Sequence, residues 1–356
     1  MAKRVTIQDI ADELGISRNT VSKAINNTGI LADTTREKVL KKAIEMGYKQ
    51  FSYVNIPGIG KPDSILVPPA LKGEISLFTS RFIGDSHFAS TMLDNFQREI
   101  SSLGYTFIMH RVQKDEIDNL VLPASYDTTK SIGIICVEMF DKEYCSMLCG
   151  MDIPVLFVDT PVYGLNEPLK ADILLMDNQS GIYSFVKEMV RRGKKKIGFI
   201  GEHFHCQSFF ERFLGYRNAM YLSGLPCPEE YCIIRNINNP PKMGCESYLS
   251  YLKRQIKDLN HLPDVFICAN DFVAIDVIHV FRELGITVPK DVYLCGFDDS
   301  PESRVITPSL TTIHIHSQIM GFSAVHLLLS RIKEPSLNFR TIHTETELIY
   351  RESTGD

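Results

Sequence analysis

The sequence predicts an all-α head of short helices followed by an α/β body built on parallel sheets. Three observations support this prediction. The first 50 residues hold two helix-capping patterns and a glycine between amphipathic segments. Beyond about residue 73, short apolar runs alternate with helical patterns, which is typical of strands joined by crossover helices. The two parts also differ in charge.

The basic charge is concentrated at the N-terminus. Residues 1–50 contain nine Lys and Arg against six Asp and Glu, a net charge of +3, whereas the whole chain of 356 residues carries −5, which leaves −8 for the remainder. A basic head on an acidic body is typical of a small nucleic-acid-binding module joined to a domain with another role.

Composition indicates a globular protein of more than one domain. Hydrophobic residues make up 44% and charged residues 23%. There is neither a signal-peptide core nor an apolar run of the roughly 20 residues that span a membrane, so a cytoplasmic location is expected. The nine cysteines include no CxxC pair, which favours reduced, buried thiols over disulfides.

The head begins with a capping box at Thr6–Asp9. A first helix is expected to run to about Glu13, and Gly15 can supply the positive φ of a tight turn. Ser17 can then cap a second helix that ends at about Asn26. The expected inner face of the first helix consists of Ile7, Ile10, Ala11 and Leu14.

A second capping pattern at Thr34–Glu37 opens a third helix, which Gly47 ends. Its expected inner face consists of Val39, Leu40, Ala43 and Ile44. Two helices around a glycine turn, with a third packed across them, form a helix-turn-helix domain, predicted here for residues 1–48.

The second helix carries side chains that suit DNA. In the major groove Arg18 can pair with guanine and Asn19 with adenine, while Lys23 suits phosphate. The alternative is a solvated face on a small packing domain. The candidate DNA-binding residues are Thr6, Ser17, Arg18, Asn19, Thr20, Ser22, Lys23 and Asn26.

The segment VTIQDIADELGISRNTVSKAINNTGILADTTREKVLKKAIEMGY resembles the DNA-binding head of the lactose-repressor (LacI/GalR) family. The body resembles the effector-binding core of the same family in ERFLGYRNAM, in PSLTTIHI and in the segment from ICAND to GFDDSP. This resemblance implies an operator-binding, homodimeric transcription regulator, expected to be a repressor. It also implies a two-lobed, periplasmic-binding-protein-like effector domain.

The expected body spans residues 74–351. Its predicted strands include EISLFTS, YTFIMHR, SIGIICVEM, PVLFVD, KIGFIGE, VFICAND and VYLCGFD. The first lobe is placed at about 74–192 plus 314–341, and the second at about 193–313 plus 342–351.

Four residues are candidates for binding a small molecule. Arg212, Asn270 and Asp298 follow predicted strands, at positions that match the family residues gripping the effector. A guanidinium, an amide and a carboxylate suit a sugar or sugar derivative, because hydroxyl groups both donate and accept. The alternatives are a surface ion pair, a turn-forming Asn and a helix N-cap. Phe88 is either a stacking wall or a core side chain.

Other groups of polar residues do not favour a metal site, a cofactor site or a catalytic site. The pairs His203/His205 and His314/His316 lack further zinc ligands at fixed spacing. Asp298, Asp299 and Glu302 have no accompanying nucleophile or phosphate loop. Two other function classes remain open: a small-molecule-binding protein with a vestigial head, and a carbohydrate-processing enzyme.

The linker, residues 49–73, departs from the family pattern. Family members usually form a short hinge helix here, which inserts a leucine into the minor groove. Pro57 stands at that leucine position, and further prolines oppose a helix. A hinge helix is therefore not expected from this sequence.

Overall fold

The computed structural model describes residues 5–26, 35, 38–39, 41–43, 46, 72–81, 87–163, 167–234 and 246–356. The chain divides into two compact units, residues 1–70 and 71–356, and each is described by itself. The predicted linker lies outside the described residues except for Lys72 and Gly73, and Gly73 already belongs to the first strand of the body. Within the described ranges, no helix is both long and apolar enough to cross a bilayer.

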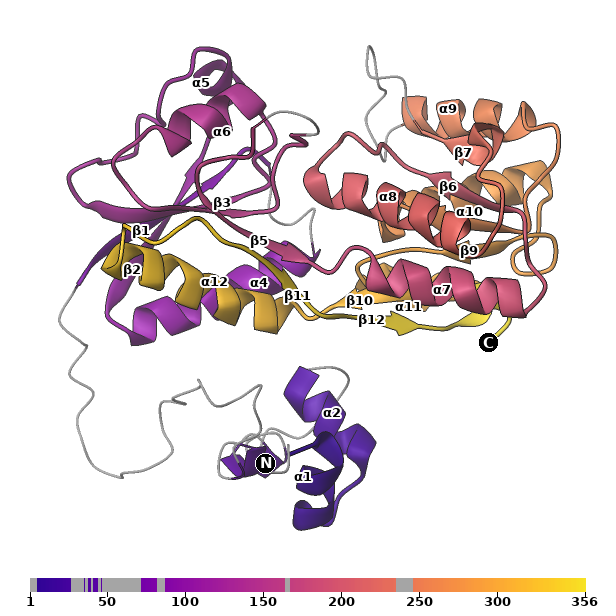
Figure 1. Ribbon diagram of the computed structural model, residues 1–356, viewed down its shortest axis with the longest axis horizontal. Coiled ribbons are helices and arrows are strands. Elements are labelled where there is room, and N and C mark those ends of the chain that lie inside the picture. The colour runs from indigo at the N-terminus through magenta and orange to yellow at the C-terminus, as the bar shows by residue number, and fades with distance from the viewer. Residues whose placement is uncertain are drawn as a thin grey trace. The chain divides into compact units, whose positions relative to one another are not determined.

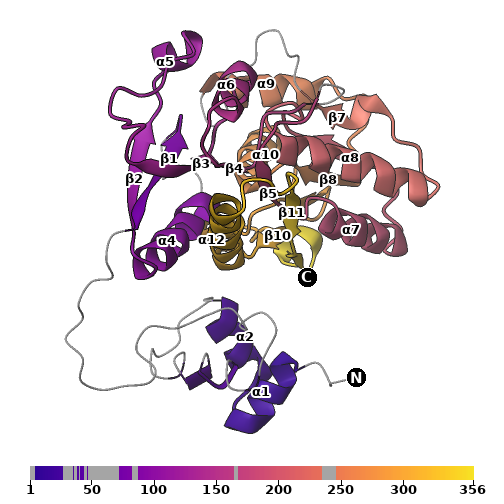
Figure 2. The same cartoon turned by 60° about the vertical axis from the view of Figure 1, so that its left-hand side comes forward.

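The head contains the predicted helix-turn-helix, formed by α1 (Ile7–Leu14) and α2 (Arg18–Asn26) (Figure 2). The capping box is confirmed, because Thr6 Oγ1 accepts from Asp9 N at 3.3 Å and Asp9 Oδ2 accepts from Thr6 N at 2.8 Å. Gly15 ends α1 with φ +64°, the left-handed conformation that the turn requires.

The core of the head joins the two helices to a third segment. Thr35, residues 38–39 and residues 41–43 are helical, and Met46 N donates to the Lys42 carbonyl at 2.9 Å. Leu40, Ile44 and Gly47, which were predicted to complete this helix, lie outside the described residues. The buried side chains are Ile10, Ala11, Val21, Ala24, Ile25, Val39 and Ala43. They include Val21, Ala24 and Ile25, which the helical spacing of the sequence predicts to form the apolar face of α2.

The first lobe of the body contains a six-stranded parallel sheet in the order β11-β5-β4-β3-β1-β2 (Figure 1). Its strands are β1 (Gly73–Thr79), β2 (Tyr105–Arg111), β3 (Ser131–Val137), β4 (Val155–Val158), β5 (Asp172–Met176) and β11 (Thr341–Thr344). The helices α4 (His87–Ser102) and α12 (Ser317–Lys333) lie side by side on one face. The other face is covered by α6 (Lys142–Cys149), and α5 (Lys114–Asp118) follows β2.

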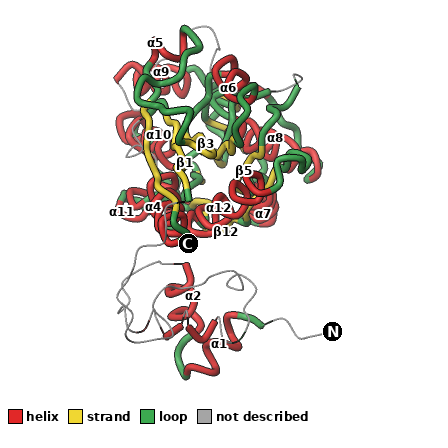
Figure 3. The backbone as a smooth tube through the Cα atoms, turned by 90° about the vertical axis from the view of Figure 1, so that its left-hand side faces the viewer, coloured by secondary structure: helices red, strands yellow, loops and turns green. Residues whose placement is uncertain are grey.

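The second lobe contains a four-stranded parallel sheet in the order β7-β6-β8-β9. Its strands are β6 (Ile197–Ile200), β7 (Cys232–Ile233), β8 (Val265–Cys268) and β9 (Tyr293–Cys295). Its helices are α7 (Ser180–Arg191), α8 (Gln207–Leu222), α9 (Glu246–Lys257), α10 (Asp271–Leu284) and α11 (Pro301–Val305). Beside them β10 (Thr312–Ile315) pairs with β12 (Thr346–Ile349) in an antiparallel ribbon. Figure 3 shows the strands of the body running between layers of helices.

The seven predicted strands of the body are present, but two of the three predicted boundaries between the lobes differ from the structure. The helix α7 packs against α8 and β12, so the first lobe ends just after β5 and not at residue 192. The strand β11 pairs with β5, so residues 342–344 belong to the first lobe and not to the second. An amphipathic pattern shows that an element has an apolar face, but it does not specify which sheet that face packs against.

The cysteines that the structure describes are all free thiols. Burial raises the pKa of Cys145 and of Cys149, the latter to about 11, so both stay protonated at neutral pH.

Candidate functional sites

The predicted DNA-reading face lies at the start of α2. Ser17 Oγ accepts from Thr20 N at 3.0 Å and lies 2.8 Å from Thr20 Oγ1, so Ser17 caps the helix as predicted. Arg18 and Asn19 are exposed in the first turn, and Lys23 is half-buried in the last turn. The opposite face of α2 belongs to the core of the head. The helix is therefore fixed by its cap and its packing, while the polar side chains of its first turn face solvent.

The other predicted DNA-binding residues have mixed surroundings. Thr6 caps α1, and its hydroxyl also donates to Asp9 Oδ2 at 2.6 Å. Ser22 is half-buried on α2, and the side chain of Asn26 lies outside the described residues. Thr6 therefore stabilises the first helix whether or not it also contacts a phosphate.

Arg212 is buried where strands of the second lobe end. Its side chain is 3% exposed and projects from α8. Nη1 donates to the carbonyl of Ala269 at 2.7 Å, directly after β8, and Nε donates to Asn178 Oδ1 at 3.0 Å. The guanidinium carbon lies 3.5 Å from the centre of the Phe297 ring, a cation–π contact. This burial excludes the surface ion pair that was the alternative for Arg212.

Asp298 lies against this guanidinium, with Oδ1 3.5 Å from Arg212 Nη1. Its φ of +114° is unusual for a non-glycine residue, and its N–H donates to the carbonyl of Ile313 at 2.8 Å. The N-cap of α11 is Ser300, so the alternative of a helix cap is wrong for Asp298. The fold thus brings together two of the side chains that were predicted to bind the effector.

Phe88 fits its alternative as a core side chain, whereas Asn270 is a helix cap and not the turn-forming residue that was its alternative. Asn270 caps α10, because its Oδ1 accepts from Val273 N at 3.0 Å. Phe88, in the first turn of α4, is half-buried against the main core cluster. Packing in the core explains the position of Phe88. Asn270 is a helix cap, but it also lies just after β8, next to the Ala269 carbonyl that Arg212 contacts.

Sequence reasoning missed two residues that contact Arg212, Asn178 and Phe297, and a third, Asp271, whose electrostatic neighbour is Asp298. Asn178 follows β5, a strand that was not predicted, and Phe297 immediately precedes Asp298. Asp271 is buried and accepts from Thr312 Oγ1 at 2.6 Å and from Ser300 N at 2.7 Å. Burial and the nearby charge of Asp298 raise the pKa of Asp271 to about 8. The Asn-Asp pair in the segment ICAND was the feature of the sequence that could have indicated Asp271.

Asp299 has a structural role. It is 2% exposed and contacts Arg304, Arg351 and His314. Burial opposes its ionisation, but these hydrogen bonds outweigh burial and lower the pKa of Asp299 to about 2. An acid held ionised between cations is a poor proton donor, so the Asp298–Asp299 pair does not resemble an acid/base couple. Among the described residues, no group of three or more His, Cys, Asp or Glu is arranged to hold a metal ion.

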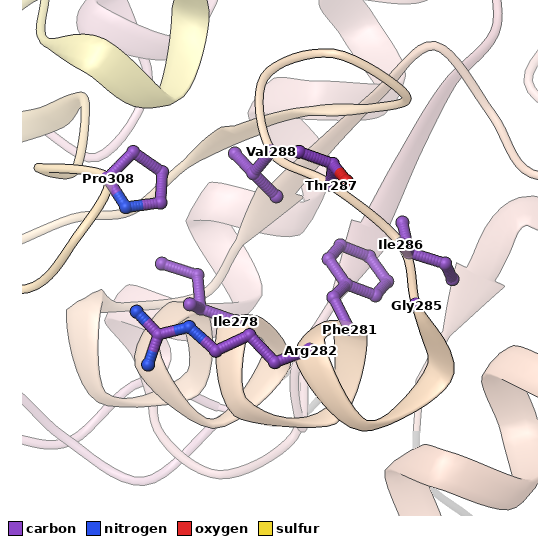
Figure 4. Close-up of a pocket in the computed structure, with 8 residues that line it drawn as sticks. All are labelled: Ile278, Phe281, Arg282, Gly285, Ile286, Thr287, Val288 and Pro308. Atoms are coloured by element: carbon purple, nitrogen blue, oxygen red, sulfur yellow. The ribbon is translucent and has the colours of Figure 1, made fainter.

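A pocket of about 270 Å³ lies elsewhere on the second lobe, between α10 and the loop after it (Figure 4). It is lined by Ile278, Phe281, Arg282, Gly285, Ile286, Thr287, Val288 and Pro308. None of these is a predicted effector-binding residue, and Arg282 Nη2 donates to the carbonyl of Thr307.

A helix-turn-helix head followed by a two-lobed α/β body defines a class of ligand-controlled regulators, and comparison with known proteins agrees. Residues 6–50 match the model of bacterial regulatory proteins of the lacI family, and residues 186–354 match a periplasmic binding protein-like domain. The chain belongs to the lacI family.

Relatives match over nearly the full length. The repressor PurR of Photobacterium profundum is 26% identical over 99% of both chains, and PurR of Actinobacillus pleuropneumoniae is 27% identical over 98% of both. Among solved structures, the regulator CelR in complex with cellobiose has a TM-score of 0.67 at 22% identity, covering 98% of this chain and 100% of that one. The Lac repressor dimer bound to operator and the anti-inducer ONPF has a TM-score of 0.64 at 20% identity, covering 99% of each chain. These structures share the fold.

Proposed function

We propose that this protein is a transcriptional repressor whose affinity for operator DNA is controlled by a small molecule bound between the lobes of the body. The observation that carries this proposal is α2, a capped helix that exposes Arg18 and Asn19 in its first turn while its other face forms the core of the head. Full-length similarity to repressors supports it. The protein would act in the cytoplasm, where its operator lies.

The first turn of α2 would enter the major groove. There Arg18 donates two hydrogen bonds to guanine and Asn19 pairs with adenine, while Ser17, Thr20 and Lys23 contact phosphates or flanking bases. A homodimer presents two such helices, so the operator is expected to be a near-palindrome of two half-sites. The Lac repressor neighbour, a dimer on its operator, supports this arrangement.

The proposed effector is a sugar or sugar derivative held by Arg212, Asn270 and Asp298. The guanidinium and carboxylate lie 3.5 Å apart at the ends of neighbouring strands, where ligands of α/β sheets collect. A hydroxyl group can donate to the carboxylate and accept from the guanidinium at once. The cellobiose bound to the neighbour CelR supports a carbohydrate. Effector and operator would each alter the affinity of the protein for the other by the same factor.

The effector half of the proposal is tested by a thermal-shift screen of the full chain against mono- and disaccharides, cellobiose included. A sugar that binds only the folded protein raises the unfolding midpoint, and the same sugar should change operator affinity. A sugar that is turned over would instead favour a carbohydrate-processing enzyme. DNA binding that is weak and insensitive to salt would favour a small-molecule-binding protein with a vestigial head.

Two variants of α2 separate base reading from phosphate contact. Arg18→Ala should cost about 1–3 kcal/mol on the best operator and little on operators altered at the base that Arg18 reads. Lys23→Ala should weaken binding to all sequences and reduce the salt slope by about 0.9, because one phosphate contact is lost. Both effects are measured by fluorescence anisotropy at several salt concentrations. Equal losses on every sequence for Arg18→Ala would exclude a base-reading role.

A further inference from the structure

A chain of hydrogen bonds and an ion pair runs from the surface of the body to Arg212. His343 Nε2 lies 3.5 Å from Glu211 Oε2, and the same oxygen accepts from Asn178 Nδ2 at 2.9 Å. Asn178 Oδ1 in turn accepts from Arg212 Nε at 3.0 Å. The Asn178 amide therefore relays between a carboxylate and a guanidinium, and it cannot flip without losing both bonds.

This chain crosses between the lobes. His343 is on β11, the edge strand of the first-lobe sheet, whereas Glu211 and Arg212 are on α8 of the second lobe. Asn178 lies in the connection from β5 to α7, where the chain passes from one lobe to the other. Asp177 lies in the same connection, and its N–H donates to the carbonyl of Thr344 at 2.7 Å. Thr344 ends β11, where the chain again passes from the first lobe toward the second. The four side chains thus join β11, a crossing segment and α8.

The charges that face His343 are both negative. Glu211 faces it from α8, and Asp177 faces it from the β5–α7 connection. The hydrogen bond to Glu211 raises the pKa of His343 against the opposing effect of burial, and Asp177 adds to the rise. Burial opposes ionisation of Glu211, but hydrogen bonds from His343, Asn178 and Gln207 outweigh it, so the pKa of Glu211 is lowered. The carboxylate is ionised at neutral pH, and the imidazole is the group of this pair that titrates there.

We propose that His343 is a positioning residue for Arg212, and that proton binding to its ring controls how firmly Arg212 is held in the effector site. The proposal rests on the proposed function, in which Arg212 grips the effector. With the ring protonated, the Glu211 carboxylate is held by a cation on one side and by the Asn178 amide on the other. Loss of the proton removes that cation and leaves Glu211 held by the amides of Gln207 and Asn178, so the chain that ends at Arg212 is anchored less firmly. The site is therefore preorganised at lower pH and looser at higher pH.

The test is to follow the Nε–H resonance of Arg212 by NMR in the full-length protein labelled with ¹⁵N-arginine, from pH 6 to pH 8.5. The resonance is assigned by its absence in Arg212→Lys. In the wild type it should show a proton-binding step whose midpoint matches that of the His343 ring and lies above about 6.5, the ordinary value for histidine. Asp271, whose pKa is about 8, can add a second step through Asp298. In His343→Gln the step that matches the His343 ring should be absent, and any step due to Asp271 should remain.

The molecule supplies an internal control in Arg331, whose Nε donates to Asp172 at 3.1 Å in a cluster without histidine. Its resonance should not titrate in either protein, and its presence shows that each variant is folded. In Glu211→Gln the midpoint of His343 should fall toward the ordinary value, and the step of the Arg212 resonance that follows His343 should be lost. A wild-type Arg212 resonance without a step at the His343 midpoint, or a step at that midpoint that persists in His343→Gln, would overturn the inference. No sugar or DNA is present, so failure of every sugar to bind would count against the proposed effector and leave this result unaffected.

Discussion

Asp172→Ala is expected to lower the free energy of unfolding of the body by about 3–5 kcal/mol. The carboxylate is 1% exposed at the start of β5. It accepts from Arg331 Nη2 at 2.9 Å, and from the backbone N–H and Nη2 of Arg340 at 2.8 and 2.7 Å. Removing it leaves the guanidinium of Arg331, itself 5% exposed, buried beside no carboxylate. The loss is measured by urea unfolding followed by circular dichroism.

The matched control is Asp118→Ala, which removes an ion pair with Lys114 whose side chains are 56% and 85% exposed. Exposed pairs contribute about 0–1 kcal/mol, so this variant should resemble the wild type. Burial raises the pKa of Asp172, but the hydrogen bonds from Arg331 and Arg340 outweigh it and the pKa is lowered. The stabilisation is therefore present above the unfolded-state pKa of about 3.9 and is lost as pH falls through the folded-state value. If Asp172→Ala and Asp118→Ala proved equally stable, the cluster would not hold β5 to α12.

Asp298→Asn is expected to yield a protein that binds its operator and no longer responds to its effector. The substitution keeps the shape of the side chain and removes the charge that pairs with Arg212 at 3.5 Å. A charge-assisted hydrogen bond to the effector is worth about 1.5–3 kcal/mol, which corresponds to about 10- to 150-fold weaker binding. Arg212→Ala is a less specific variant, because it also removes the bonds to Asn178 and Ala269.

The measurement is operator affinity of the Asp298→Asn protein with and without the sugar found by thermal shift. Operator affinity without sugar should equal that of the wild type, because the head is fixed by its own caps and core. Asp291→Asn, in an exposed loop of the same lobe, is the control and should respond normally. A normal response in Asp298→Asn would place the effector site elsewhere.

The parts of the fold that the sequence predicts are those governed by local chemistry. The cap at Thr6, the positive φ at Gly15 and the apolar face of α2 each depend on residues a few positions apart, and all three are present. The strand β5 was missed because it begins with Asp172. A charged residue inside a sheet is explained only by Arg331 and Arg340, more than 150 residues away.

In the candidate site too, the residues that depend on distant contacts were the ones missed. Arg212 and Asp298 were predicted from the family resemblance together with their positions after strands, and the fold brings them together. Asn178 and His343 were not predicted, because both are far from α8 in the sequence and contact it only through Glu211 or Arg212 in the folded body. Asn178 lies where the chain crosses between the lobes after β5, and His343 lies on β11, just before another crossing. Those crossings depend on β11 joining the first-lobe sheet and α7 joining the second lobe, and no periodicity in the sequence specifies either choice.

The central claim is tested most directly by selecting bound sequences from a random DNA duplex library with the full-length protein and with Arg18→Ala. The wild type should enrich a near-palindrome of two half-sites whose centres lie about one helical turn, or a multiple of it, apart. Arg18→Ala should relax one base position, and the same position should be relaxed in both half-sites. No enriched sequence, an asymmetric sequence, or a consensus unchanged by Arg18→Ala would contradict an operator read by paired α2 helices.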